Sequence, residues 1–304
     1  MKRLLFKILR YSGLPLLFRE IWQRRKVTIL LFHDIDRATA EKTFDYLSSR
    51  YNIISLDRFV QACLRRDAGA IPEKAMILTF DDGHIGNHAI KPVVERLNIP
   101  VTIFLCAGII NTNRHYWFTW PHPGIGKSAL KRMPNREKLR LLAESGFRVN
   151  REFDAPQAMS LEQINDLKGV IDLQAHTIFH PILPQCDDDE AHEEIVTAKK
   201  ILERLLDLEI SSIAYPNGDY CDRDIELAKE AGYRSGITVD FGFNTIDSDL
   251  FRLKRLSVND TKNLDELAVK ASGVWAFFKT RNGKKQDHGF MNRPYAGKPV
   301  VKHI

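Results

Sequence analysis

Short, nearly continuous apolar runs alternate with longer amphipathic stretches along most of this chain. Such runs are typical of strands buried on both faces, and we expect strands at residues 27–32, 75–80, 101–105, 170–174, 212–215, 235–239 and 253–258. Helical periodicity lies between them, at residues 38–49, 87–97, 136–145, 188–206 and 222–231. This alternation predicts an α/β fold with a parallel sheet, and the number of units favours a barrel over an open sheet.

Two helix starts are marked by capping residues. Ser55 has the side chain of an N-cap for a helix that begins at Leu56. Ser160 and Gln163 stand at capping-box spacing, which predicts a further helix from residue 160. Both starts therefore fit helices that alternate with the predicted strands.

The composition fits one large domain with short appendages. A chain of 304 residues that is 44% apolar can bury a sizeable core, and no linker rich in Pro, Gly or Ser divides it. We expect a domain at residues 27–278, a basic amphipathic segment at 1–26 and a basic, loosely structured tail at 279–304. The four cysteines are scattered and form no CxxC pair, which argues against a zinc finger or a redox motif.

The N-terminal segment mixes bulky apolar residues with basic ones. Lys7 and Arg10 interrupt its apolar run, so the segment matches neither a secretory signal nor a membrane-spanning helix. Two interpretations stay open, a segment lying in the membrane interface and an amphipathic helix packed on the domain. We expect a cytoplasmic location, with the inner face of the membrane as a peripheral partner. Nucleic acid is not expected as a partner, because the basic residues do not interleave with aromatic ones in any recognised motif.

Polar residues directly follow four of the predicted strands: His33, the pair Asp81 and Asp82, the pair His176 and His180, and Pro216-Asn217-Gly218. The loops after parallel strands build the active sites of α/β folds. Each group alone has a structural explanation, since Asp-Gly is a common turn and a lone histidine often packs in a core. Because all four groups directly follow predicted strands, together they indicate an active site.

Two imidazoles and one carboxylate form a three-ligand set for a divalent cation, most naturally zinc. Such a set leaves positions open for water and substrate, which is typical of a catalytic site. A second carboxylate beside the ligand has the chemistry to take a proton from the attacking water. Spacing alone leaves open which of Asp81 and Asp82 is the ligand and which is the base.

Three segments resemble the signatures of the NodB-homology polysaccharide deacetylases, carbohydrate esterase family 4: LTFDDG at 78–83, HTIFHP at 176–181 and AYPNG at 214–218. The resemblance covers residues 27–258 and implies a distorted (β/α) barrel. It also implies Asp81 as the base and Asp82, His176 and His180 as the metal ligands. By the same similarity, the backbone N–H of Asn217 stabilises the oxyanion. Tyr215, Pro216 and Gly218 beside it are expected to bind substrate.

The sequence departs from the family pattern at two places. The third signature usually begins with an arginine that orients the base, whereas this chain has Ala214. The late Leu-x-His that commonly supplies the general acid has no match at 253–258. One branch of the family carries this histidine after the first strand, and the segment FHDI at 32–35 resembles that arrangement. His33 is therefore the candidate acid.

Aromatic residues gather between two predicted strands, at 116–120. Trp117 is a candidate to stack on a sugar ring, although such clusters more often pack a segment onto its domain. His84, His115 and His122 are expected at the surface.

These features predict a metal-dependent hydrolase that removes N-acetyl groups from the amino sugars of a polysaccharide, oligosaccharide or lipid-linked glycan precursor in cell-envelope or exopolysaccharide synthesis. One alternative keeps the metal site but hydrolyses a formyl group or another amide. The other is a catalytically silent glycan-binding domain, which Ala214 and the missing late histidine favour. Intact titratable clusters at strand ends favour an enzyme instead.

Overall fold

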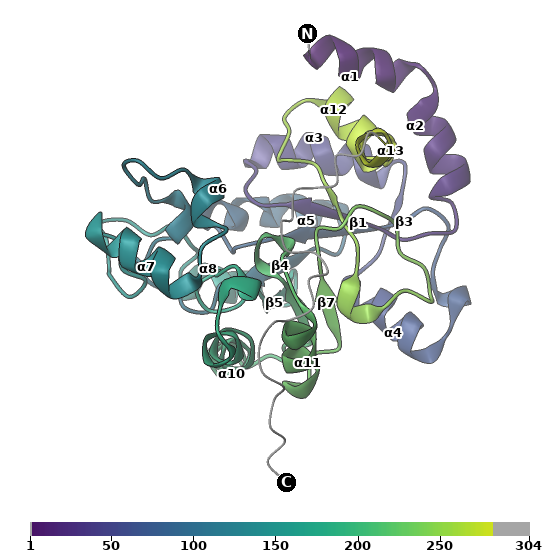
Figure 1. Ribbon diagram of the computed structural model, residues 1–304. Coiled ribbons are helices and arrows are strands. Elements are labelled where there is room, and N and C mark those ends of the chain that lie inside the picture. The colour runs from purple at the N-terminus through teal and green to yellow at the C-terminus, as the bar shows by residue number, and fades with distance from the viewer. Residues whose placement is uncertain (1, 282–304) are drawn as a thin grey trace.

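The computed structural model describes residues 2–281, and its core is one parallel sheet (Figure 1). The strands are β1 Thr28–Phe32, β2 Asn52–Ile53, β3 Ala75–Phe80, β4 Thr102–Leu105, β5 Asp172–Ala175, β6 Ser212–Ala214, β7 Ser235–Ile237 and β8 Leu256–Ser257. They pair in the order β7-β6-β5-β4-β3-β1-β8, and β2 also pairs with β3. Every predicted strand is present; β3 has the predicted bounds, β5 is shifted toward the C-terminus, and the others are shorter than predicted.

The sheet curls until its two edges almost meet. At one edge β8 pairs with β1, with Leu256 opposite Leu30. At the other edge a single parallel bridge joins Ile237 of β7 to Leu253, which lies just before β8. A barrel held by one bridge at this seam is a distorted barrel, which confirms the fold predicted from the sequence.

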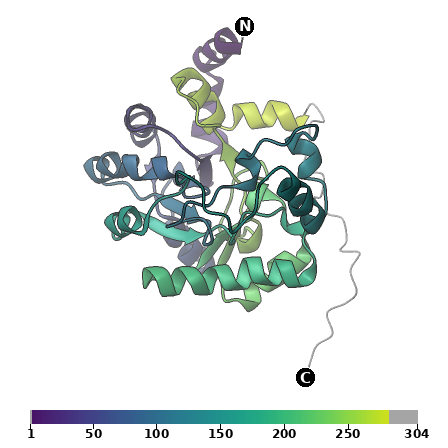
Figure 2. The same cartoon turned by 90° about the vertical axis from the view of Figure 1, so that its left-hand side faces the viewer.

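Helices surround the sheet (Figure 2). They are α1 Lys2–Tyr11, α2 Leu14–Leu17, α3 Arg37–Ser48, α4 Leu56–Arg65, α5 Lys91–Leu97, α6 Lys127–Leu130, α7 Asn135–Glu144, α8 Leu161–Leu167, α9 Asp188–His192, α10 Ala198–Leu206, α11 Asp222–Glu230, α12 Leu264–Ala271 and α13 Val274–Arg281. Short 3-10 turns lie at Ala68–Ala70, Ile85–Ile90, Trp117–Thr119, Leu183–Gln185, Pro216–Gly218 and Leu250–Arg252, and π-helical turns at Phe18–Trp22 and Glu193–Thr197.

Both predicted helix starts are confirmed. The Ser55 side chain accepts a hydrogen bond from the backbone N–H of Arg58, and Ser160 forms a full capping box with Gln163. The predicted helix at 188–206 is present, but a π-helical turn interrupts it. Residues 279–281 belong to α13, so this part of the predicted tail is helical, and the rest lies outside the described residues.

Strand residues alternate between two apolar clusters. Ile29 and Ile77 point into the barrel, where they share one apolar cluster with Phe59 of α4. Leu30 and Leu78 belong instead to the large cluster between the sheet and the outer helices. Because side chains alternate along a strand, polar residues that continue the inward face beyond the strand end point into the top of the barrel.

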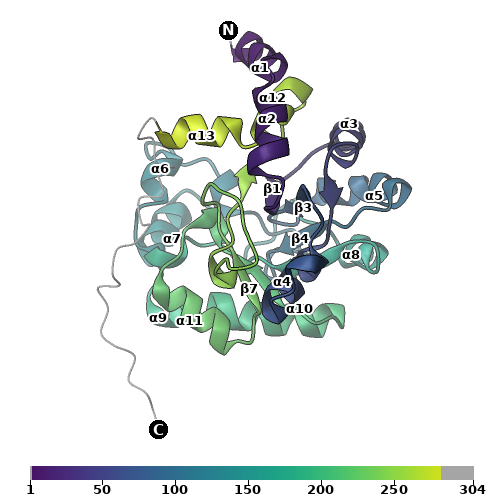
Figure 3. The same ribbon diagram turned by 90° about the vertical axis from the view of Figure 1, so that its right-hand side faces the viewer.

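The N-terminal segment packs beside the barrel (Figures 1 and 3). Its Phe6 is buried against Val269 of α12 and Val274 of α13. The other side of the same segment leaves large apolar side chains exposed, namely Leu4, Leu5, Ile8, Tyr11, Leu16, Leu17, Ile21 and Trp22. Packing on the domain therefore accounts for one face of the segment only. No helix within residues 2–281 is long and apolar enough to cross a bilayer.

Candidate active site

One pocket opens at the carboxyl end of the barrel strands. It has a volume of about 430 Å³, within the range of small-ligand sites. Leu31, two residues beyond the inward-facing Ile29, lines it. Asp81 continues the inward face of β3 in the same way and also lines the pocket. The strand ends thus bring together polar groups that are far apart in the sequence.

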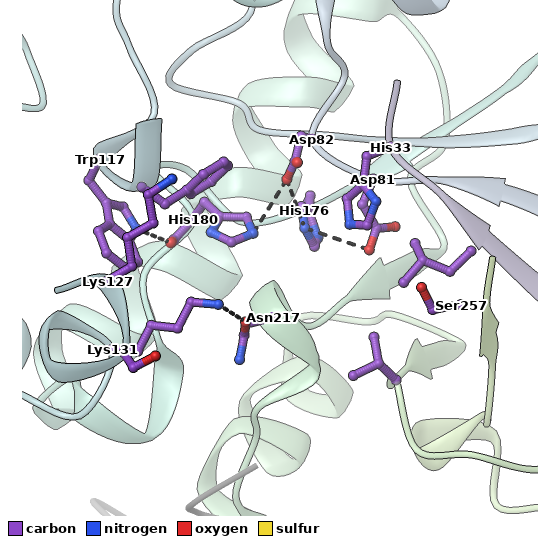
Figure 4. Close-up of a pocket in the computed structure, with 14 residues that line it drawn as sticks. His33, Asp81, Asp82, Trp117, Lys127, Lys131, His176, His180, Asn217 and Ser257 are labelled. Carbon is purple, nitrogen blue, oxygen red and sulfur yellow. Dashed lines mark hydrogen bonds and ion pairs between the residues drawn. The ribbon is translucent and has the colours of Figure 1, made fainter. Parts of the chain in front are cut away.

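Asp82, His176 and His180 converge in this pocket (Figure 4). The Oδ1 atom of Asp82 lies 3.4 Å from Nε2 of His176 and 3.3 Å from Nε2 of His180. This oxygen is buried and has no hydrogen-bond partner, although a buried carboxylate oxygen is costly to leave unpaired. An orphaned oxygen between two imidazole nitrogens fits a divalent cation, and this donor set suits zinc.

Neighbouring groups hold two of these side chains in place. The Nδ1–H of His176 donates to the backbone carbonyl of Ala214 at 2.7 Å, which leaves Nε2 with its lone pair toward the pocket. Nε2 of His84 hydrogen-bonds the second oxygen of Asp82 at 3.0 Å. The expectation that His84 lies at the surface is wrong, because this residue turns inward to the carboxylate. Such partners of ligand side chains fix ligand orientation.

The protonation states suit a cation site. Burial lowers the pKa of His180 to about 3, although Asp82 opposes this shift, so the imidazole is neutral at neutral pH. Burial by itself raises the pKa of Asp82, but His180, His176 and His84 together hold that pKa well below its ordinary value. A neutral imidazole and an ionised carboxylate are the forms that bind metal ions.

The turn that carries both histidines is anchored by Glu194. Its Oε2 accepts hydrogen bonds from the backbone N–H groups of Ile178 at 2.7 Å and Phe179 at 2.9 Å. Burial raises the pKa of Glu194 to about 7, and these two N–H groups partly oppose the shift. Thr177 and His180 adopt positive φ values of 65° and 57°, which makes the turn tight enough to aim both imidazoles at Asp82.

Asp81 is held by Arg255 rather than by a residue of the third signature. The guanidinium donates to both carboxylate oxygens at 2.7 Å and also bonds the Thr79 hydroxyl and the Thr238 carbonyl. Arg255 is fully buried and comes from the segment just before β8. An arginine from the segment just before β8 therefore holds Asp81 in place of the one missing at Ala214. Ala214, one of the two departures from the family pattern, therefore no longer favours a catalytically silent domain.

The ion pair keeps Asp81 ionised. Burial alone raises the pKa of a carboxyl, but the charge and hydrogen bonds of Arg255, together with His176 and His33, lower the pKa of Asp81 below its ordinary value. A bidentate pair also fixes the plane of the carboxylate. Asp81 is thus an oriented proton acceptor beside the three converging ligand atoms, with Oδ2 at 3.9 Å from Nε2 of His176.

His33 also lines the pocket, on the Asp81 side of His176 in Figure 4. Asp260 accepts from its backbone N–H at 2.8 Å and faces its Nδ1 at 3.4 Å, and Asn87 donates to its carbonyl. Loss of water contact alone lowers the pKa of His33, yet Asp260, Asp82 and Asp81 raise that pKa to about 9. His33 is therefore a protonated, held imidazolium at neutral pH.

Asn217 is the residue of the third signature that reaches the pocket. It has φ 58°, and its backbone N–H makes no hydrogen bond within the described part of the chain. The neighbouring residues lie deeper: Pro216 and Gly218 are buried, and the Tyr215 hydroxyl donates to the carbonyl of Phe251. None of these three neighbours lines the pocket. Their contact with substrate stays a prediction.

Trp117 lines the pocket but is only 2% exposed. Its indole N–H donates to the carbonyl of His180 at 2.7 Å, and the Lys138 ammonium lies 4.1 Å from its ring centre. The side chain therefore packs the segment after β4 onto the histidine turn. Phe118 beside it also lines the pocket and offers a further apolar wall.

Sequence patterns did not reveal four residues that position the site. Arg255 and Asp260 lie 174 and 227 residues from the groups they hold, and Glu194 lies in a separate helical turn, 15 residues after Phe179, so no local spacing links them to those groups. His84 directly follows Asp81-Asp82-Gly83, and this closeness in sequence is the one signal that could have linked it to the site.

Comparison with known proteins agrees with the geometry. The polysaccharide deacetylase family model matches residues 68–236, which is more than half of the chain. A putative polysaccharide deacetylase of Bacillus subtilis, YxkH, is 22% identical over 188 residues, or 62% of this chain. The chain spans about half the length (52%) of this curated relative.

Solved structures share the fold. The Streptococcus pyogenes deacetylase PplD, in complex with acetate, aligns with a TM-score of 0.59 and 20% identity, covering 81% of this chain and 98% of that one. IcaB from Ammonifex degensii aligns with a TM-score of 0.59 and 18% identity, covering 81% and 97%. With three signature segments, a distorted parallel barrel and a matching family model, this chain belongs to the polysaccharide deacetylase family.

Proposed function

We propose that this protein hydrolyses the N-acetyl group of an amino sugar in a polysaccharide, oligosaccharide or lipid-linked glycan, in envelope or exopolysaccharide synthesis. The observation that carries the proposal is the convergence of Asp82, His176 and His180 beside the Asp81–Arg255 pair in one pocket. Family membership supplies the reaction class. The sugar, the metal dependence and the setting are part of the proposal.

Asp82, His176 and His180 would hold a divalent cation, with zinc the best match to their donor atoms. Such a cation, when bound, polarises a carbonyl oxygen and makes a coordinated water more acidic. Hydrolysis requires that the water oxygen bonds the acetyl carbon, that the C–N bond breaks, and that acetate and a free amine leave. The protein must remove one proton from the water and give one to the nitrogen.

The chain's own side chains fit these two proton transfers. Asp81 is ionised and oriented by Arg255, so it accepts the proton of the attacking water. His33 is protonated and held by Asp260, so it donates to the leaving nitrogen. The backbone N–H of Asn217, which makes no hydrogen bond within the described part of the chain, is available to stabilise the negative charge that develops on the carbonyl oxygen.

Acetate release from N-acetylated glycans tests this function. Wild type is expected to release acetate, and Asp81→Asn to lose at least about 10²-fold in rate, because the amide cannot accept the proton. Asp45→Asn, which changes an exposed aspartate of α3, serves as the matched control. Formate release from N-formyl analogues at a higher rate than acetate release would favour the deformylase alternative, and release of neither would leave only a binding role.

We further propose that the protein works at the cytoplasmic face of a membrane. In support, Leu4, Ile8 and Tyr11 are exposed at the spacing of one helical stripe. Exposed Arg3 and Lys7 lie on the same helix, α1, and complement anionic lipid headgroups. An apolar stripe with flanking basic residues is the pattern of a helix that lies in the membrane interface.

A further inference from the structure

Two lysines line the pocket opposite the converging ligand atoms (Figure 4). Lys127 lies in the short helix α6 and Lys131 directly follows it, in the long segment between β4 and β5. The Lys131 ammonium donates to the side-chain oxygen of Asn217 across the pocket. Lys127 makes no hydrogen bond or ion pair with the side chains that the structure describes and is free to meet a ligand.

Neither lysine forms an ion pair with a side chain that the structure describes, although Asp219 and Asp82 act on Lys131 from a longer distance. Among the described side chains, no carboxylate lies within 4.0 Å of either ammonium group. Asp81 and Asp82 are the acidic residues in the pocket lining, and both are engaged by other groups, Asp81 by Arg255 and Asp82 by histidines. Hydrolysis of an uncharged acetamide does not by itself require two lysines in the pocket lining.

Lys131 is also partly withdrawn from water. Burial lowers the pKa of Lys131, and the neighbouring Lys127 lowers it as well, whereas Asp219 and Asp82 oppose the shift. Two like charges that line one pocket repel each other in the free protein, in line with the effect of Lys127 on Lys131. An anion bound between the two lysines would offset that repulsion, because charge-assisted hydrogen bonds to phosphate or carboxylate oxygens are strong.

From this placement we infer that the pocket contains an anion subsite, formed by Lys127 and Lys131, for a phosphate or carboxylate group on the amino sugar. This inference rests on the proposed function and narrows its substrate to anionic sugars. Phosphate esters and sugar acids share the oxygen chemistry that two ammonium groups bind. Both lysines and the three ligand side chains line the same pocket, so a sugar bound there would lie beside both.

Calorimetric binding to the intact protein tests the subsite independently of turnover. The probes are N-acetylglucosamine, its 1-phosphate, its 6-phosphate and N-acetylmuramic acid, which separate a neutral sugar from phosphate and carboxylate forms. At least one anionic probe is expected to bind about tenfold or more tightly than the neutral sugar. Lys127→Gln is expected to remove about tenfold of that preference while leaving neutral-sugar binding unchanged.

Two further variants exclude indirect effects. Lys200→Gln changes an exposed lysine of α10 outside the pocket and is expected to bind like wild type. Lys131→Gln is expected to weaken anionic probes more than the neutral one, whereas a role limited to holding Asn217 would weaken both equally. If no anionic probe binds more tightly than the neutral sugar, or Lys127→Gln keeps the full preference, the subsite is refuted.

The outcome is separable from that of the proposed function. Lysine-dependent binding without acetate release would keep the subsite and overturn the deacetylase proposal. Acetate release from N-acetylated glycans, with no anionic probe bound more tightly than the neutral sugar, would keep the deacetylase proposal and overturn the subsite.

Discussion

Asp81 is fixed by a buried arginine that lies more than 170 residues away along the chain. Arg255 reaches both carboxylate oxygens, the Thr79 hydroxyl and the Thr238 carbonyl, so each nitrogen of its guanidinium donates a hydrogen bond. His33 is held in a comparable way by Asp260, through both its backbone and its ring. Each proposed proton-transfer group therefore has a dedicated partner of opposite charge.

Arg255→Lys should impair Asp81 as the base while keeping a positive charge beside it. Lysine supplies one point charge but cannot form the bidentate fork, so the plane of Asp81 is no longer fixed. We expect acetate release to fall by about 10²-fold. Because Arg255 lowers the pKa of Asp81, its weakening should move the acidic limb of the kcat/KM profile to higher pH.

Arg223→Lys is the matched control for this change. Arg223 is also largely buried and pairs with Asp224, but it lies outside the pocket. The Arg223→Lys variant should have lower thermal stability, while the acidic limb of its kcat/KM profile stays in place. An Arg255→Lys protein with wild-type rate and pH profile would exclude Arg255 as the residue that positions the base.

Asp260→Asn should shift the alkaline limb. The pKa of His33 is raised to about 9 with Asp260 present, so the protonated acid is populated below about pH 9 and lost above it. The amide oxygen of the substituted side chain can still accept from the His33 backbone, whereas the negative charge is gone. The pKa of His33 then falls, and activity is lost at a lower pH.

The pH profile of kcat/KM measures this shift. Asp166→Asn changes an aspartate that hydrogen-bonds another histidine, His88 at 2.9 Å, outside the pocket, and its alkaline limb should match wild type. An alkaline limb that stays in place in Asp260→Asn would mean that His33 is not the acid.

At the scale of elements, strand ends and the turns after them build the site. Their positions could be predicted, because apolar runs mark the strands and signature residues follow them. The conformations of the turns could not be predicted. Asp82, His180 and Asn217 all adopt positive φ, and the pattern of apolar residues carries no information about that angle. The anchor of the histidine turn, Glu194, lies in the π-helical turn between α9 and α10, at positions expected to form regular helix.

Glu194→Ala should loosen this turn. The substitution leaves the buried N–H groups of Ile178 and Phe179 without an acceptor, at a cost of about 1–3 kcal/mol for each. We expect lower thermal stability and, because His176 and His180 lose their support, about 10- to 100-fold weaker zinc binding.

Glu194→Gln serves as the conservative control. The pKa of Glu194 is raised to about 7, so below that pH the native side chain is largely the neutral acid, which the amide resembles. Glutamine also keeps an acceptor oxygen. Its zinc affinity at pH 6 should stay within a few-fold of wild type, and an equal loss in both variants would show that the turn does not depend on this acceptor.

At the scale of the whole molecule, the distorted barrel follows from the alternation of strands and helices. The sequence did not predict how the barrel closes, because one bridge between Ile237 and Leu253 decides it. Nor did it decide between the two interpretations of the N-terminal segment. Phe6 packs on α12 and α13 while Leu4 and Ile8 remain exposed, so the segment has a packed face and an open one.

The open face should bind anionic membranes. Leu4→Ser with Ile8→Ser removes two exposed apolar side chains, and we expect co-sedimentation with phosphatidylglycerol-containing vesicles to weaken at least about tenfold. Leu64→Ser changes a leucine of similar exposure, 53% against 62% for Leu4, on α4 and should have no effect. Equal binding by wild type and the double variant, or binding by neither, would contradict the proposed membrane surface.

Acetate release before and after metal removal tests the proposed site most directly. The wild-type protein should lose activity on treatment with a chelator and regain it with about one equivalent of zinc per chain. His176→Ala should show neither the activity nor the tight zinc binding, because it removes one of the three converging ligand atoms. Full acetate release by the chelated protein, or by His176→Ala, would contradict the assignment of Asp82, His176 and His180 as the metal ligands of a deacetylase.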